Sequence, residues 1–268
     1  LLGHILVASG LCIFYGGTAA DCLCAGLCGL FLGIVDHLLG KLHPNAFFQK
    51  IATGFLMALF AYGLAGLGMS TNIDTSVIGT LMLLVPGLLF TNALRDIIFG
   101  DTNSGVNRTV TALLIACGVA LGTASAWNAA NVLWGIPAAP APLAHSDLAT
   151  CIASFVACVG FLFVWNIHGE GSWLCALGGS LTWAIFCIAR DFGFGYGMCC
   201  FFGTIVASVY AEVMARLRKY PAISYLIVSL VPLIPGSNIY YTAQQAVLRN
   251  WAGFLHQGYL TLLTAGVM

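Results

Sequence analysis

Long apolar stretches, separated by short polar turns, run along the whole chain. A helix needs about 20 apolar residues to cross the ~30 Å hydrocarbon core of a membrane. The windows that fit this pattern cover residues 1–15, 18–39, 46–69, 76–98, 106–127, 148–167, 172–189, 193–215, 222–248 and 251–268. The first would be only about 22 Å long as a helix, so we expect that span to be truncated. The pattern predicts an all-α integral membrane protein with about ten transmembrane helices.

Two of these windows contain a helix-breaking pair. Pro86-Gly87 interrupts the fourth window, 76–98, and Pro235-Gly236 interrupts the ninth, 222–248. Proline inside a helix removes one backbone hydrogen bond and clashes with the preceding turn. Within a membrane this is tolerated only where protein or a water-filled cavity satisfies the freed groups. We therefore expect transmembrane helices 4 and 9 to be broken at Pro-Gly.

The breaks belong to a wider internal similarity. Leu23–Leu27 resembles Leu174–Gly178, and the two members lie nearly as far apart along the chain as the two Pro-Gly pairs. We predict a first five-helix membrane repeat at 1–127, an extracytoplasmic linker at 128–147 and a second five-helix repeat at 148–268. Because each repeat has an odd number of spans, the two insert in opposite orientations. Matched breaks in inverted repeats are typical of a transporter's binding site, and ordinary proline kinks are the alternative.

Composition agrees with a membrane protein. The chain is 60% hydrophobic and 7% charged, with a mean hydropathy of +0.97. Its zero net charge excludes nucleic acid as an expected partner. All eleven cysteines fall in apolar runs, where cysteine behaves as a small hydrophobe, and the histidines show no ligand spacing. We predict no metal, no cofactor and no catalytic residue.

The positive charges orient the helices. With the start of the chain inside, seven of the nine Lys and Arg residues fall in inside connections and two, Arg190 and Arg249, outside. The linker 128–147 contains no Lys or Arg, as an outside loop should. We expect both ends of the chain to be cytoplasmic and the membrane to be the bacterial plasma (inner) membrane.

Candidate solute contacts follow each break, where a restarting helix presents unpaired amide groups that suit a carboxylate. Ser237 and Asn238 lie at the second restart. After the first, Thr91/Arg95 and Asn92/Asp96 are each spaced i,i+4 and so share a helix face. Arg95 would hold a carboxylate and Asp96 an amine or a proton, unless both lie at the membrane boundary. The predicted substrate-binding residues are Pro86, Gly87, Thr91, Asn92, Arg95, Asp96, Pro235, Gly236, Ser237 and Asn238.

Four charged residues are candidates for proton coupling or gating. They are Asp21, Asp96, Asp101 and Arg108. Ionisable groups at membrane depth are functional by default. Helix capping is the simpler explanation of Asp21, and a charge-paired cytoplasmic lid is an alternative for the other three.

Several segments resemble one family. Leu84–Gly87, Thr91–Asp96, Gly100–Gly105 and Arg108 are similar to the hallmark segment of the threonine/serine exporter family. Phe14–Asp21 and Val231–Ser237 resemble other segments of its two membrane domains, here fused in one chain. The resemblance implies ten spans and proton-driven export, as an antiporter, of small hydroxy amino acids. It also implies a soluble segment before the first span, which this sequence lacks. Relatives with split halves are linked to succinate.

Alternatives stay open. A dicarboxylate exporter would need two groups that bind a carboxylate, each either a cationic side chain or the start of a helix. Arg95 and the helix start after the second break would supply them. A membrane-embedded lipid-modifying enzyme would need a nucleophile and base, which the sequence does not group. A channel would not explain charges beside two matched breaks. The expected partners are a small solute with a carboxylate, protons and membrane lipids, and homo-oligomerisation is left open.

Overall fold

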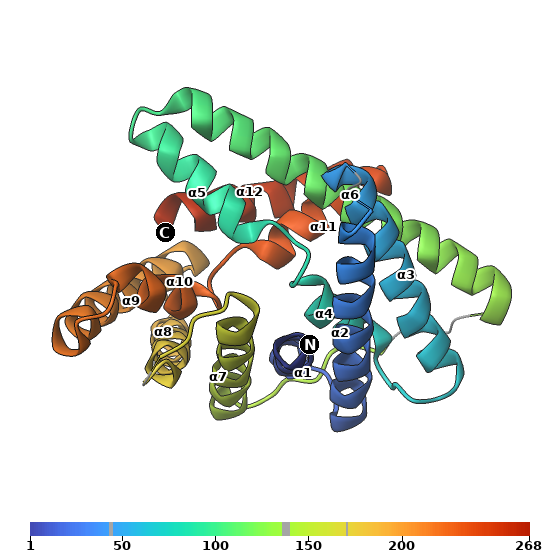
Figure 1. The fold of residues 1–268 in the computed structure, drawn as a ribbon, viewed down its shortest axis with the longest axis horizontal. Coiled ribbons are helices and arrows are strands. Elements are labelled where there is room, and N and C mark those ends of the chain that lie inside the picture. The colour runs from blue at the N-terminus through green and yellow to red at the C-terminus, as the bar shows by residue number, and fades with distance from the viewer. Residues whose placement is uncertain (43–44, 136–139, 170) are drawn as a thin grey trace.

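The computed structural model describes residues 1–42, 45–135, 140–169 and 171–268. Within these ranges the chain forms twelve α-helices and no strand (Figure 1). The helices are α1 (Leu2–Phe14), α2 (Ala19–Gly40), α3 (Ala46–Gly66), α4 (Ile73–Leu81), α5 (Gly87–Ile98), α6 (Thr102–Trp134), α7 (Asp147–Val164), α8 (Trp173–Asp191), α9 (Tyr196–Arg218), α10 (Ala222–Leu230), α11 (Gly236–Val247) and α12 (Trp251–Val267).

Polar residues in the connections start several of these helices. Thr18 and Asp21 form a capping box at the start of α2, in which each side chain bonds the other residue's backbone amide. Asp101, Ser146 and Asn250 accept backbone hydrogen bonds at the starts of α6, α7 and α12. Such a cap contributes about 1 kcal/mol to a helix. The polar residues between the apolar stretches therefore determine where several of the helices begin.

The chain is not helical at two places inside long apolar windows. Helix α4 ends at Leu81 and α5 begins at Gly87, with Pro86 immediately before it. Helix α10 ends at Leu230 and α11 begins at Gly236, again directly after a proline. Residues 82–86 and 231–235 form turns instead. Each half of the chain thus contains a pair of short helices in the same place.

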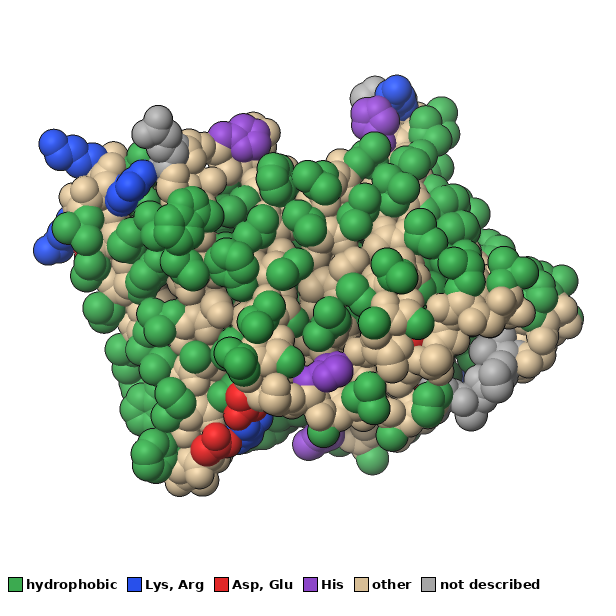
Figure 2. Space-filling view, turned by 90° about the horizontal axis from the view of Figure 1, so that it is seen from below, with side chains coloured by type: hydrophobic (Ala, Val, Ile, Leu, Met, Phe, Trp, Pro, Cys, Tyr) green, Lys and Arg blue, Asp and Glu red, His purple; other side chains and the backbone are tan. Residues whose placement is uncertain are grey.

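Six helices in the described part of the chain are long and apolar enough to cross a membrane. These are α2, α3, α6, α7, α8 and α9. The short helices of the broken pairs, together with α1 and α12, fall below that length, so the count of ten spans stays a prediction. Figure 2 shows hydrophobic side chains over most of one face, with the charged ones at its edges. This surface suits lipid rather than water.

Glycines let the two halves of the chain approach closely. Helix α1 packs along α7, where a methyl group on Gly10 would lie 2.7 Å from the Ala157 amide nitrogen. Gly3 and Gly160 pack against each other's helix in the same way. Helix α11 of the second half lies against α6 of the first. Small residues are the usual means of tight packing between membrane helices.

Pairs of glycines spaced four apart pack within the first half as well. Gly29 and Gly33 of α2 lie against His4 of α1. Gly118 and Gly122 of α6 lie against α3, where Gly122 meets the Ile51 backbone. The small-xxx-small spacing of the sequence therefore marks real helix contacts.

Three connections meet on one face of the molecule. The Leu143 amide donates to the Gly16 carbonyl at 2.9 Å, and the Asn72 side chain donates to the Pro140 carbonyl at 2.8 Å. His145 Nε2 lies 2.9 Å from the carbonyl oxygen of Gly17. Residues 136–139 of the expected linker lie outside the described residues. The rest of the linker therefore covers the α1–α2 and α3–α4 connections, which alternating spans place on the same side as the linker.

Candidate solute site

The two helix interruptions touch each other. A methyl group on Gly87 would lie 3.0 Å from the Cα atom of Gly236 and 2.5 Å from the Ile234 side chain. On Gly236 it would lie 3.1 Å from the Met82 sulfur. Only glycine lets the two backbones pass this closely. The starts of α5 and α11 therefore face one small region inside the protein.

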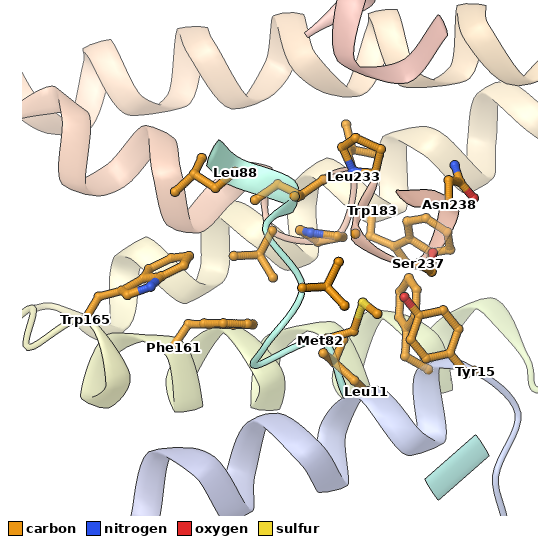
Figure 3. A pocket seen from close by; sticks show the side chains of 18 of the residues that line it. Leu11, Tyr15, Met82, Leu88, Phe161, Trp165, Trp183, Leu233, Ser237 and Asn238 are labelled. Atoms are coloured by element: carbon orange, nitrogen blue, oxygen red, sulfur yellow. The ribbon is translucent and has the colours of Figure 1, made fainter. Parts of the chain in front are cut away.

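A cavity of about 230 Å³ opens beside this crossing (Figure 3). Both interruptions contribute to it, together with α1, α7, α8 and the start of α9. Its lining consists of Leu11, Phe14, Tyr15, Met82, Val85, Gly87, Leu88, Phe161, Trp165, Trp183, Tyr196, Val231, Pro232, Leu233, Ile234, Pro235, Gly236, Ser237 and Asn238. A cavity below the usual 300–1,000 Å³ of drug-sized pockets suits a small solute.

One end of the cavity is polar. Figure 3 shows Tyr15, Ser237 and Asn238 together at this end. Tyr15 and Tyr196 line the cavity together with Ser237 and Asn238. Two hydroxyl-bearing rings from the first and second halves therefore meet the first turn of α11.

The other end is aromatic and apolar. Phe161 of α7 and Trp165, which directly follows α7, stack with their ring centroids 4.7 Å apart, and Figure 3 places them near Leu88. Trp183 of α8 is held by a 2.9 Å hydrogen bond from its indole nitrogen to Thr150 Oγ1. These rings give the cavity rigid walls that fit the apolar part of a solute.

The starts of α5 and α11 leave backbone donors for a ligand. Pro86 and Pro235 precede these helices, and neither helix start has a side-chain cap. Proline's side chain has no acceptor, so the first amide groups of both helices lack a side-chain partner. In α11 the Gly236 amide donates to the Ile234 carbonyl at 2.7 Å, which leaves the amides of Ser237 and Asn238, two residues that line the cavity. The arrangement presents partial positive charge to a bound anion.

The predicted binding residues divide into two groups. Gly87, Pro235, Gly236, Ser237 and Asn238 line the cavity. Pro86 directly precedes Gly87 at the helix start.

The other group lies further along α5, outside the cavity lining. Thr91 donates to the Gly87 carbonyl of its own helix at 3.1 Å. Arg95 is exposed, with its guanidinium 5.7 Å from the centre of the Phe99 ring. The structure does not bring Thr91, Asn92, Arg95 or Asp96 into contact with Ser237 and Asn238.

The charged candidates for coupling or gating also lie away from the cavity. Asp96 of α5 forms an ion pair with Arg108 of α6. Asp101 lies between these helices, where its carboxylate accepts from the Ser104 amide at 3.3 Å. These three residues tie α5 to α6 at one end of both helices.

Asp21 is fully buried, and both oxygens of its carboxylate accept hydrogen bonds. Its carboxylate accepts from the Thr18 amide at 2.8 Å, from Ser70 at 2.7 Å, and from the amides of Thr71 and Asn72 at 2.7 and 2.8 Å. A carboxylate with this many donors holds the start of α2 against the α3–α4 connection. The contacts account for its burial.

Comparison with known families decides what kind of protein carries this cavity. Residues 1–130 match the family model ThrE, of threonine/serine exporters, and residues 150–268 match a second threonine/serine exporter model, ThrE_2. The chain belongs to the threonine/serine exporter family. This exporter is therefore an integral membrane protein of a transporter family, with small amino acids as the family's substrates. Comparison with curated proteins and with solved structures gave no match.

Sequence reasoning missed the partners that the exporter brings to Ser237 and Asn238. Tyr15 and Tyr196 come from the end of α1 and the start of α9, far from either Pro-Gly pair in the chain. A weak signal was available, since both are aromatic residues with a polar tip at the edge of an apolar run. In the described part of the chain, His, Cys, Asp and Glu form no group of three that could hold a metal.

Proposed function

We propose that this exporter carries threonine and serine and that the cavity at the Gly87–Gly236 crossing is its solute site. The observation that carries the proposal is the polar end of the cavity. There the uncapped start of α11 and the phenol groups of Tyr15 and Tyr196 line the same cavity. A hydroxy amino acid presents a carboxylate and a hydroxyl group on neighbouring carbons. The cavity offers donors for both within one turn of α11.

The solute's carboxylate binds at the start of α11. The amides of Ser237 and Asn238 donate to it, and the helix dipole favours its negative charge. The Ser237 hydroxyl and the Asn238 side chain add donors beside them. The side-chain hydroxyl of the solute bonds the Tyr15 or Tyr196 phenol, and its methyl group or methylene contacts the aromatic walls.

Transport follows from the placement of the broken helices. Pairs α4–α5 and α10–α11 occupy equivalent positions in two inverted repeats and reach the crossing from opposite sides of the membrane. Rocking one repeat against the other exposes the cavity to each side in turn. The face that carries the linker is extracytoplasmic, both chain ends are cytoplasmic, and the membrane is the bacterial inner membrane.

The charged cluster of α5 and α6 serves as a gate in this scheme. Asp96, Arg108 and Asp101 lie outside the cavity, at the end of α5 away from the crossing. Their ion pair and cap hold α5 against α6, so breaking them would free α5 to move. Export is coupled to the proton gradient. Arg95, exposed beside this cluster, attracts anionic solutes to the gate.

A dicarboxylate such as succinate is the second candidate solute. It is favoured by one observation, that two uncapped helix starts meet at the crossing. Each would take one carboxylate. Hydroxy amino acids rank first because the phenols of Tyr15 and Tyr196 have no role with a dicarboxylate's apolar centre.

Counterflow in vesicles tests the proposal. Vesicles containing the full-length protein and loaded with threonine should accumulate labelled threonine, and external serine should compete. Ser237→Ala and Asn238→Ala should each weaken threonine competition about tenfold, the cost of one hydrogen bond to a charged group. Ser125→Ala is the matched control, because Ser125 is exposed on α6 and bonds only its own helix.

The outcomes separate the two solute classes. Competition by succinate without competition by threonine would replace the first candidate with the second. Threonine counterflow that is unchanged in both cavity variants would disprove the site. Threonine efflux that a protonophore leaves untouched would remove the coupling to protons.

A further inference from the structure

Rings that line the cavity form a continuous chain across three helices. Phe14, the last residue of α1, lies 5.5 Å from Tyr15 and 4.5 Å from Trp183 of α8, measured between ring centroids. Trp183 stacks on Phe186 at 4.6 Å with nearly parallel planes, and Phe186 meets the Tyr196 ring edge-on at 5.7 Å. We call these five residues the aromatic arc. All of them except Phe186 line the cavity, and a phenol group stands at each end of the arc.

Trp183 is the centre of the aromatic arc and is held in a fixed position. Its indole N–H donates to Thr150 Oγ1 at 2.9 Å, and the Thr150 hydroxyl donates to the Asp147 carbonyl at 2.9 Å. Phe186, on which the indole stacks, is buried. Because its only N–H group is already bonded, the indole offers the cavity the π-system of its ring and no further donor.

The solute's ammonium group needs a partner that the carboxylate and hydroxyl contacts do not supply. Among the described residues that line the cavity there is no aspartate and no glutamate. The start of α11 carries partial positive charge, which attracts the carboxylate and repels an ammonium group. In an α-amino acid both groups are bonded to the same carbon atom, so the ammonium lies close to the carboxylate. Its partner is therefore an uncharged group of the cavity wall near the first turn of α11.

Aromatic rings bind a cation without carrying a charge of their own. The face of a ring is the negative part of its quadrupole, and tryptophan attracts cations more strongly than tyrosine or phenylalanine. The attraction is larger where water is excluded. The aromatic arc brings one indole and two phenol rings to the cavity that Ser237 and Asn238 also line. The phenol oxygens add hydrogen-bond acceptors at both ends of the arc.

From this arrangement we infer that the aromatic arc binds the ammonium group of the solute, with Trp183 as its strongest ring. The ammonium lies against the rings while the carboxylate bonds the amides at the start of α11. One phenol oxygen accepts from an ammonium N–H, and the other phenol remains for the solute's hydroxyl group. The inference rests on the proposed transport of amino acids and names the contact that separates them from hydroxy acids and dicarboxylates.

The aromatic arc also links ammonium binding to the arrangement of the two halves of the chain. Phe14 and Tyr15 belong to the first half, and Trp183, Phe186 and Tyr196 belong to the second. A cation held among these rings stabilises the arrangement in which the Phe14 and Trp183 rings touch. A solute without an ammonium group stabilises it less.

Competition assays on vesicles with the full-length protein test the inference. They measure how strongly threonine and 3-hydroxybutyrate, which is threonine without the amine, compete with labelled threonine in counterflow. The variants are Trp183→Leu, Trp183→Phe and a series with increasing numbers of fluorine atoms on the indole at position 183. Fluorine draws electron density from the face of the ring and hardly changes its shape. Trp127→Leu is the matched control, because Trp127 is exposed on α6 and lies outside the cavity lining.

Loss of the ring's negative face should affect threonine alone. We expect Trp183→Leu to weaken competition by threonine about tenfold or more and to leave 3-hydroxybutyrate unchanged. Trp183→Phe should show a smaller loss of the same kind. Each added fluorine should weaken threonine further, and Trp127→Leu should change neither competitor.

Other results would overturn the inference. These are equal losses for the two competitors in Trp183→Leu, threonine competition that stays constant along the fluorinated series, or wild-type competition by 3-hydroxybutyrate as strong as that by threonine. The fluorinated series keeps the test open if Trp183→Leu does not fold, which its melting temperature in detergent would show. Absence of threonine counterflow in the wild-type protein would instead disprove the proposed function.

Discussion

Gly87 and Gly236 lie in direct backbone contact, at 3.0 Å between a methyl group placed on the first and the Cα atom of the second. Each is the first residue of a helix, and each follows a proline. The two helix starts therefore point into the same small volume although 148 residues separate them in the chain. A side chain at either position would push apart the walls of the cavity.

A larger residue at this contact should stop transport. In Gly87→Val the new side chain would meet Ile234 and the Gly236 backbone, which cannot move as a flexible side chain can. We expect threonine counterflow to fall at least tenfold while the protein still inserts and folds. Gly63→Ala is the control, because the nearest atom to its new methyl group lies 3.9 Å away. Activity of Gly87→Val near the wild-type rate would show that the crossing does not need glycine.

Removing the charge of Asp21 should destabilise the protein. Asp21→Asn replaces an acceptor for the Ser70, Thr71 and Asn72 donors with an amide that brings donors of its own. We expect a loss of about 3 kcal/mol, visible as a lower melting temperature in detergent. Glu212→Gln, at an exposed ion pair, should change the stability by less than about 1 kcal/mol. A stable Asp21→Asn variant that has lost only proton coupling would favour a transport role for this residue.

Breaking the Asp96–Arg108 pair should affect transport more than stability. Both side chains are partly exposed, so the pair contributes less than about 1 kcal/mol to folding. If the pair acts as a gate, Asp96→Asn and Arg108→Gln should change the transport rate by similar factors. The double variant should then add little to either, because the two residues share one interaction. Independent, additive effects in the cycle would contradict a paired gate.

The size of the cavity should limit which solutes compete. A volume of about 230 Å³ admits serine and threonine, and we expect no competition by phenylalanine or tryptophan. Leu88→Ala should enlarge the apolar end and let leucine compete. Leu133→Ala, at an exposed position of α6, is the matched control. Competition by aromatic amino acids in the wild-type protein would indicate a different solute site.

Several features of the fold could be predicted from the sequence because neighbouring residues determine them. Proline lacks an amide and its ring clashes with the preceding turn, so the sequence predicts an interruption at each Pro-Gly pair. In the structure α4 and α10 end several residues before these pairs, at Leu81 and Leu230. Small residues four apart mark a helix face, and Gly122 does pack against the Ile51 backbone. Ser237 and Asn238 were predicted as solute contacts because they directly follow a Pro-Gly pair, and both line the cavity.

The sequence did not show which elements, far apart in the chain, contact one another in the fold. The i,i+4 spacing of Thr91 and Arg95 shows that they share a face of α5 but not which neighbour that face meets.

The sequence by itself determined that this chain crosses a membrane, where Pro-Gly pairs interrupt its apolar windows and which family it belongs to. Hydrophobic length, proline geometry and motif similarity need no knowledge of distant contacts. The tertiary structure decided that Tyr15 and Tyr196 line one cavity with Ser237 and Asn238. This arrangement depends on how α1, α9 and α11 pack, and packing is set by the shapes of many side chains at once.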